Sequence, residues 1–125
     1  MNKPTKSFRE LIVWQKAHQL VLTTYTITKG FPKEELFGLT SQMRRSSVSV
    51  AANIVEGYRK RGKADKARFL NISEASLDEF NYYFLLSNHL NYITAIDHER
   101  VEIQCQEVSK LLNAYSSTIR KSSNS

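Results

Sequence analysis

Apolar side chains recur at helical spacing in four successive segments of this 125-residue chain. The first segment steps by three and four residues through Leu11, Trp14, His18, Val21, Tyr25 and Thr28, and the last does so through Val101, Cys105, Val108, Leu112, Tyr115 and Ile119. Steps of three and four place side chains on one face of an α-helix. The pattern therefore predicts amphipathic helices that bury these faces against one another.

Four such helices are predicted, over about residues 8–29, 34–57, 65–91 and 97–120. At about 1.5 Å per residue each would be on the order of 30–40 Å long, so the helices are well matched for packing side by side. Short connections force neighbouring helices to run antiparallel. We therefore predict an all-α protein in which residues 1–125 form one domain, an antiparallel up-down-up-down four-helix bundle.

Individual residues mark where the helices begin and end. Ser7 and Glu10 have the spacing of a capping box, in which each side chain accepts a hydrogen bond from the backbone N–H of the other residue. Gly30 is predicted to end the first helix in a left-handed conformation, and Gly57 to end the second. Asp97 is the expected N-cap of the fourth helix.

The sequence shows no signal for secretion or membrane insertion. No apolar run approaches the roughly 20 residues that span a bilayer, and the first ten residues lack the apolar stretch of a signal peptide. The single cysteine, Cys105, cannot form an internal disulfide and is predicted to be a small buried side chain. We expect a cytoplasmic protein that makes no contact with membranes.

Two patterns associated with catalysis or metal binding are incomplete. Residues 57–64 read GYRKRGKA, which resembles a P-loop, but alanine replaces the magnesium-binding serine or threonine, and a helix precedes the stretch where a P-loop follows a strand. None of His18, His89 and His98 completes the Glu-x-x-His spacing of di-iron bundles. His18 is predicted to be a hydrogen-bonded histidine in the core or at an interface. We expect no enzymatic activity, no cofactor and no metal ion.

The strongest functional signal is positive charge. Lys plus Arg total 18 against 12 Asp plus Glu, a formal net charge of +6. The candidate nucleic-acid-binding residues are Arg44, Arg45, Arg59, Lys60, Arg61, Lys63, Lys66 and Arg68. Such clusters neutralise phosphates with little reading of the base sequence. Tyr58 and the Tyr82–Tyr83 pair are candidates to stack on unpaired bases, which favours RNA over DNA as the partner.

Two other interpretations of these residues stay open. A basic loop can simply be solvated, with the nearby aromatic side chains in the core. A basic loop can also bind an acidic protein surface. In addition, the second helix has small side chains at residues 46, 47, 49, 51 and 52, which allow another helix to approach it closely. The alternative function is therefore a protein–protein assembly or adaptor module that does not bind nucleic acid directly.

Large apolar side chains exceed what four helices bury internally. They are Trp14, Tyr25, Tyr82, Tyr83, Phe84, Leu85 and Leu86. Because exposed apolar area of this size marks interaction surfaces, we predict that the chain forms a homo-oligomer.

Several phrases of the chain resemble a known family. They are FREL at residues 8–11, VWQKA at 13–17, FP at 31–32, GL at 38–39, QMRR at 42–45, SSVSVAANIVEG at 46–57, FL at 69–70 and ASL at 75–77. The chain resembles the four-helix-bundle proteins encoded in intervening sequences of 23S ribosomal RNA genes, and it is similar to the accessory protein of diversity-generating retroelements. The resemblance extends over about residues 8–119.

This resemblance implies a bundle that assembles into a ring-like homopentamer and is not an enzyme. For the retroelement relatives it also implies that a basic surface binds nucleic acid and a reverse transcriptase. Arg44 and Arg45 match the family phrase itself, whereas residues 59–68 match in basic character only. Our leading hypothesis is a non-catalytic, oligomeric nucleic-acid-binding protein.

Overall fold

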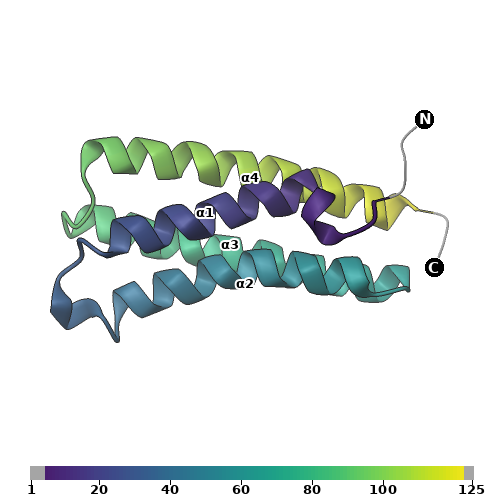
Figure 1. Ribbon diagram of the computed structural model, residues 1–125, viewed down its shortest axis with the longest axis horizontal. Helices are drawn as coiled ribbons and strands as arrows, with labels where there is room; N and C mark the ends of the chain where they lie inside the picture. The colour runs from purple at the N-terminus through teal and green to yellow at the C-terminus, as the bar shows by residue number, and fades with distance from the viewer. Residues whose placement is uncertain (1–4, 123–125) are drawn as a thin grey trace.

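Four long helices lie side by side, each antiparallel to the next along the chain (Figure 1). The computed structural model describes residues 5–122. Its elements are η1 (Phe8–Glu10), α1 (Ile12–Thr28), η2 (Lys33–Glu35), α2 (Leu39–Arg59), α3 (Lys63–His89) and α4 (Ala95–Lys121), where η denotes a 3-10 helix. Helix α2 contacts α1 and α3, and α4 contacts α3 and α1, so the four helices enclose one core. The predicted all-α, antiparallel four-helix bundle is confirmed.

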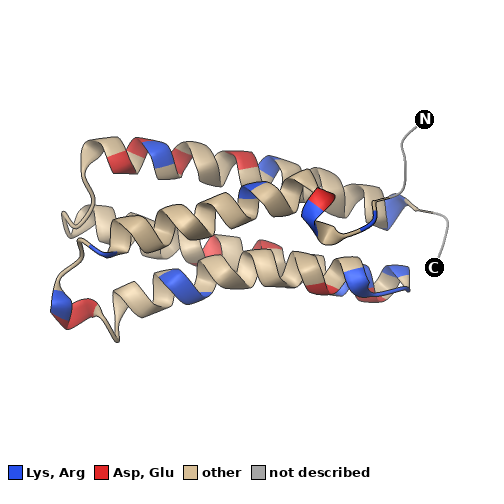
Figure 2. Ribbon diagram, in the orientation of Figure 1, with Lys and Arg blue, Asp and Glu red and all other residues tan. Residues whose placement is uncertain are grey.

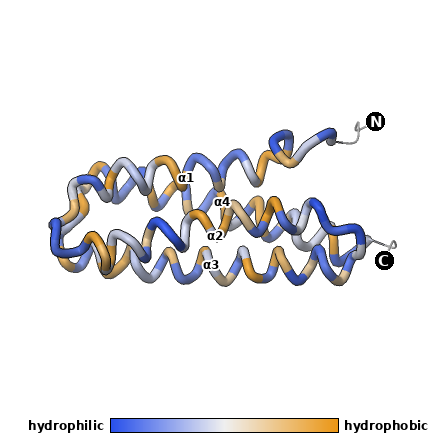
Figure 3. The backbone as a smooth tube through the Cα atoms, turned by 60° about the horizontal axis from the view of Figure 1, so that its bottom comes forward, coloured by the Kyte–Doolittle hydropathy of each residue, from blue (hydrophilic) through white to orange (hydrophobic). Residues whose placement is uncertain are grey.

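Apolar side chains from all four helices fill the centre of the bundle. The largest fully buried ones are Leu20, Met43, Ile54, Leu70, Phe80 and Leu112. Hydrophobic and hydrophilic residues alternate along every helix (Figure 3), as expected when one face of each helix is removed from water. The predicted burial of Cys105 is confirmed, because 6% of its surface is exposed. Burial raises the pKa of its thiol to about 12.

The contact between α2 and α3 is the most extensive in the bundle, and small polar residues make it possible. The Ser73 hydroxyl donates to the Val50 carbonyl across the two helices at 2.7 Å. The hydroxyls of Ser49 and Ser76 lie 2.8 Å apart at the same contact. Buried Ser73 and the partly buried Ser49 and Ser76 therefore each have a hydrogen-bond partner, which offsets the free energy of removing their hydroxyls from water.

Gly57 lies inside α2, at this close contact with α3. The prediction that Gly57 ends the helix is therefore wrong. Helix α2 continues to Arg59. A Cβ atom added to Gly57 would lie 3.4 Å from both the Lys66 carbonyl oxygen and the Phe69 Cβ atom, on α3. Gly57 therefore faces α3, which begins at Lys63, at a point where the two helices approach closely.

The N-terminal boundary also differs from the prediction. The chain first forms η1, and Leu11 is then extended before α1 begins. The Ser7 hydroxyl accepts a hydrogen bond from the Arg9 N–H at 3.0 Å, whereas the Glu10 carboxylate accepts one from the Lys6 N–H at 3.3 Å. The capping-box prediction is therefore wrong, because the two side chains bind backbone groups of other residues.

An aromatic cluster holds η1 against α1. The Phe8 ring meets the Trp14 ring edge-on, with 5.0 Å between centroids, and the His18 ring stacks on the Trp14 ring at 4.9 Å. The Gln15 side-chain amide also donates to the Arg9 carbonyl at 2.8 Å. His18 is exposed, so the prediction that it is a core histidine is wrong for the single chain.

The connection between α1 and α2 is longer than predicted. No glycine in the part of the chain that the structure describes has a positive φ, so the left-handed conformation predicted for Gly30 is wrong. Its N–H instead bonds to the Ile27 carbonyl at 3.2 Å, in a turn that ends α1. The 3-10 helix η2 follows, and the Glu35 carboxylate accepts a hydrogen bond from the Leu39 N–H at 3.2 Å. Helix α2 therefore begins at Leu39, not near residue 34.

Helix α4 begins earlier than predicted, and Thr94 is its N-cap. The Thr94 hydroxyl accepts a hydrogen bond from the Asp97 N–H at 3.2 Å, which places Asp97 in the first turn. In the preceding turn, Asn91 adopts the left-handed conformation with φ 62°. None of the described helices has the combination of length and hydropathy that a membrane span requires.

Replacing Thr94 with alanine is expected to lower the free energy of unfolding by about 1 kcal/mol, because a backbone N–H of α4 loses its side-chain acceptor. Thr94→Ser keeps a hydroxyl at the cap and should retain most of the stability. Urea denaturation of the two variants and the wild type measures the difference. Equal stability of the alanine and serine variants would show that Thr94 does not cap the helix.

Candidate nucleic-acid interface

Many lysine and arginine residues lie at one end of the bundle (Figure 2). We call this region the basic end and define it as Lys6, Arg9, Arg59, Lys60, Arg61, Lys63, Lys66, Arg68, Arg120 and Lys121. Three acidic residues, Glu10, Glu56 and Asp65, lie among these ten. The basic end therefore has an excess of seven positive charges, which exceeds the net charge of +6 of the whole chain.

The up-down-up-down topology brings these cations together. It places the α2–α3 connection, the N-terminal segment and the end of α4 at the same end of the bundle (Figure 1). The hydroxyls of Thr5 and Tyr58 lie 2.8 Å apart and join the N-terminal segment to α2. Arg61 and Lys63, from the α2–α3 connection, line the same cavity as Ile119 of α4.

The Phe69 ring holds two of the cations. The Lys60 ammonium lies 5.1 Å from the ring centroid, and the Arg68 guanidinium lies 4.8 Å from it. Such contacts contribute about 0.5–1 kcal/mol each at exposed sites. Arg68 also approaches Asp65 at 3.9 Å, but both side chains are largely exposed, so this ion pair adds little stability. Both cations are thus oriented and remain within reach of a phosphate.

Lys66 joins the end of α2 to α3. Its ammonium donates to the Gly57 and Tyr58 carbonyls at 3.2 and 2.9 Å, which are carbonyls of the last turn of α2. The same ammonium lies 5.8 Å from the centroid of the Tyr58 ring. Partial burial lowers the pKa of Lys66 from its ordinary value. Lys66 therefore has a structural role in the basic end, in addition to its charge.

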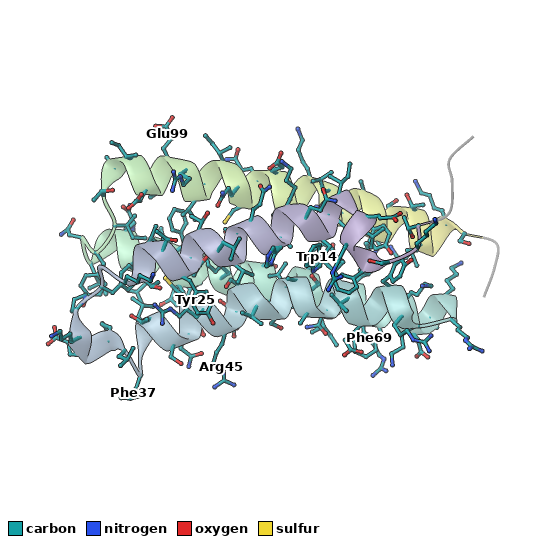
Figure 4. The ribbon with its side chains drawn as sticks, in the orientation of Figure 1. Trp14, Tyr25, Phe37, Arg45, Phe69 and Glu99 are labelled. Carbon is teal, nitrogen blue, oxygen red and sulfur yellow. The ribbon has the colours of Figure 1, made fainter. Side chains whose placement is uncertain are left out.

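Arg44 and Arg45 lie apart from the basic end, although we predicted that they bind nucleic acid together with the cations of residues 59–68. Arg45 and Phe69 are widely separated along the bundle (Figure 4), and Arg45 is about 21 Å from Arg59 along the axis of α2. The Arg44 Nε donates to the Thr28 hydroxyl at 2.9 Å, and its guanidinium lies 4.7 Å from the centroid of the Tyr25 ring. Arg44 therefore connects α2 to α1, whereas Arg45 is exposed.

Arg44→Ala is expected to lower the free energy of unfolding by about 1–2 kcal/mol, because the hydrogen bond from a charged donor and the cation–π contact are both lost. The neighbouring substitution Arg45→Ala removes the same charge from an exposed position and should change stability by less than about 0.5 kcal/mol. Thermal unfolding of the matched pair compares them. Similar effects of the two substitutions would contradict a structural role for Arg44.

Aromatic side chains at the basic end differ from those predicted. Tyr82 and Tyr83 lie farther along α3, about 24 Å from Lys66 at the rise of an α-helix, with 6.0 Å between their ring centroids. Of the three tyrosines considered for base stacking, only Tyr58 lies among the cations. Phe69 was not predicted from the sequence, although its position three residues after a lysine and next to an arginine is a signal for a ring with nearby cations.

Four cations near the two ends of the chain were also not predicted from the sequence to belong to the interface. These are Lys6 and Arg9 near the start, and Arg120 and Lys121 at the end of α4. None of these four residues was a candidate, although the predicted topology places the start of the first helix and the end of the last helix beside the connection between the second and third helices. Topology is therefore the signal that could have found them.

Other candidate chemistry is not assembled in the described residues. Residues 5–122 contain no group of three or more His, Cys, Asp and Glu side chains that could hold a metal ion. The stretch resembling a P-loop is divided, because Gly57 lies within α2 and Lys63 begins α3. His98 approaches Glu102 at 3.6 Å, one turn along α4, which is an ordinary pair on a helix surface.

Comparison with known proteins agrees with this fold. No curated protein sequence matches the chain. A crystal structure of a protein of unknown function from the S23 ribosomal protein family, from Bacteroides thetaiotaomicron, is similar with a TM-score of 0.78 and 27% sequence identity, over 85% of this chain and 96% of that chain. The profile of the 23S rRNA-intervening sequence proteins matches residues 9–114. The chain therefore belongs to the 23S rRNA-intervening sequence protein family.

Proposed function

We propose that this protein is a non-catalytic, oligomeric protein of the cytoplasm that binds nucleic acid, RNA in preference to DNA. The observation that carries the proposal is the excess of positive charge at the basic end. A local excess of this size attracts a polyanion at long range and releases counterions when phosphates replace them.

The side chains of the basic end suit phosphate binding. Arg59, Arg61 and Arg68 are exposed, and only Arg68 has an ion-pair partner among the described residues, at 3.9 Å. Arginine can bind a phosphate with two parallel hydrogen bonds. Contacts of this kind fix the position of a nucleic acid but do not read its bases. We therefore expect affinity for many RNAs, with modest sequence preference.

The names of the relatives favour RNA. The matching family is named for an intervening sequence of 23S ribosomal RNA, and the similar crystal structure is assigned to a ribosomal protein family. Tyr58 adds a partly buried ring among the cations, on which an unpaired base of a single-stranded RNA segment can stack.

Binding of the purified protein to labelled 23S rRNA fragments, to unrelated RNA and to duplex DNA of equal length, across a salt series, tests the proposal. The logarithm of the association constant should fall steeply and linearly with the logarithm of the salt concentration. No binding to any of these at low salt would refute it and favour the assembly function described next.

Exposed apolar side chains favour a second candidate function, protein assembly. Phe37 and Ile96, at the end of the bundle opposite the basic end, are 94% and 79% exposed. Tyr25 and Tyr82, two of the aromatic side chains predicted to remain outside the core, are exposed. Phe84 is buried, so the prediction is wrong for this residue. Exposed apolar side chains of this size are candidates for a surface that another chain covers.

The partners proposed for this surface are further copies of the chain, in a homopentamer, as the family resemblance implies. A protein partner such as a reverse transcriptase, implied by the resemblance to the retroelement proteins, is proposed to contact the basic end. Light scattering of the purified protein gives the number of subunits directly. A solution mass equal to that of one chain, 14.4 kDa, would refute the oligomer.

A further inference from the structure

A small cavity at the basic end is lined mainly by cations. Its volume is about 250 Å³, and its lining residues are Arg61, Lys63, Lys66, Ile119 and Ser122. No carboxylate belongs to this lining. Pockets for drug-sized ligands have volumes of roughly 300–1,000 Å³, so this cavity suits a smaller group. Its charge selects an anion.

The cations of the cavity differ in mobility. The Lys66 ammonium is fixed by its hydrogen bonds to the Gly57 and Tyr58 carbonyls. An ammonium has three N–H donors, so one remains available after these two bonds. Arg61 and Lys63 form no ion pair within the described residues and can turn toward a ligand. One fixed charge and two adjustable charges therefore surround the same space.

The start of α3 adds backbone donors on the same side. Gly62 is the N-cap of this 27-residue helix and supplies no side chain to cap it. The first N–H groups of an α-helix have no partner within the helix, and the helix dipole favours an anion there. A Cβ atom added to Gly62 would meet no atom within 4 Å, so the chain is uncrowded at the residue that precedes α3.

We propose that this cavity binds the terminal phosphate group of a nucleic-acid strand, a phosphomonoester at its 5′ or 3′ end. The inference rests on the proposed function and adds to it a preference for strand ends. A terminal phosphate carries about −1.5 to −2 charges at pH 7, which matches several cations better than the single charge of an internal phosphodiester. It is also joined to only one sugar and can enter a small cavity, whereas an internal phosphate has a sugar on each side.

Three RNAs of ten nucleotides and identical sequence test the proposal: one with a 5′-phosphate, one with a 3′-phosphate and one with hydroxyls at both ends. We expect the wild type to bind at least one phosphorylated RNA about tenfold more tightly than the hydroxyl RNA. The double variant Arg61→Ala, Lys63→Ala should lose this preference. Equal affinity of the wild type for all three RNAs would overturn the proposal, and so would a preference that the double variant retains.

Arg59→Ala is the matched control, because Arg59 is exposed at the same end but does not line the cavity. It should weaken binding of all three RNAs alike and keep the preference for a phosphorylated end. If no RNA binds the wild type, the proposed function fails, and inorganic phosphate then tests the cavity by itself. Phosphate should raise the melting temperature of the wild type more than that of the double variant, relative to chloride at equal ionic strength. An equal rise in both would overturn the cavity proposal.

Discussion

Replacing Arg59, Lys60, Arg61 and Lys63 together with alanine is expected to weaken RNA binding by at least about 100-fold at roughly 0.1 M salt. Each cation that contacts a phosphate of a single strand contributes about 0.7 to the slope of the logarithm of affinity against the logarithm of salt concentration. Losing four such contacts should therefore reduce the slope by about 3. Fluorescence anisotropy with a labelled RNA at several salt concentrations measures both quantities.

A matched variant separates position from total charge. Lys29, Lys33, Arg100 and Lys110 are exposed cations outside the basic end, and replacing these four with alanine also lowers the formal charge from +6 to +2. This control should keep most of the affinity and most of the salt slope. If the two variants lose affinity equally, binding depends on net charge, and the basic end is not the interface.

Phe80→Ala is expected to have the largest effect on stability, lowering the free energy of unfolding by about 3–5 kcal/mol. The Phe80 ring is completely buried in α3 and lies 6.5 Å from the Phe84 ring. Its removal loses apolar burial and leaves a cavity that the helices fill only in part. Since small domains are stable by about 5–15 kcal/mol in total, the melting temperature should fall by roughly 10–20 °C.

Phe37→Ala is the control for this substitution, because it removes the same side chain from a position that is 94% exposed. In the monomer it should change stability by less than about 0.5 kcal/mol. Calorimetry of both variants at low protein concentration compares the two sites. A large loss in Phe37→Ala that grows with protein concentration would place Phe37 in a subunit interface. A small loss in Phe80→Ala would contradict the core described above.

The fold was predictable because one rule decides it. Apolar spacing of three and four residues identifies helices, and four helices of similar length with short connections have few ways to bury their apolar faces. The helix boundaries were less predictable, because they depend on tertiary contacts. Gly57 illustrates this: the sequence suggests a helix end, whereas the residue lies inside α2, where Phe69 on α3 approaches it closely. The sequence predicts Asp97 as the N-cap of α4, whereas the structure shows Thr94 in that position with its hydroxyl accepting from the Asp97 N–H.

The candidate interface was predictable only in its central part. Arg59 to Arg68 are close in sequence, so their proximity in space follows directly. Lys6 and Arg120 join them through the topology of the bundle, over a separation that local patterns do not reveal. Arg44 was assigned from its charge, whereas its contacts with Thr28 and Tyr25 require the packing of α1 on α2. Residue type thus predicts charge, and packing decides whether the charge is available to a partner.

Ultraviolet cross-linking of the wild-type protein to a labelled RNA, followed by mass spectrometry of the protein fragments, would locate the RNA on the bundle. We expect adducts in residues 58–69 and in the last turn of α4. Cross-links concentrated in residues 31–38 and 89–97, at the opposite end of the bundle, would contradict the proposed interface, and so would the absence of any cross-link at low salt.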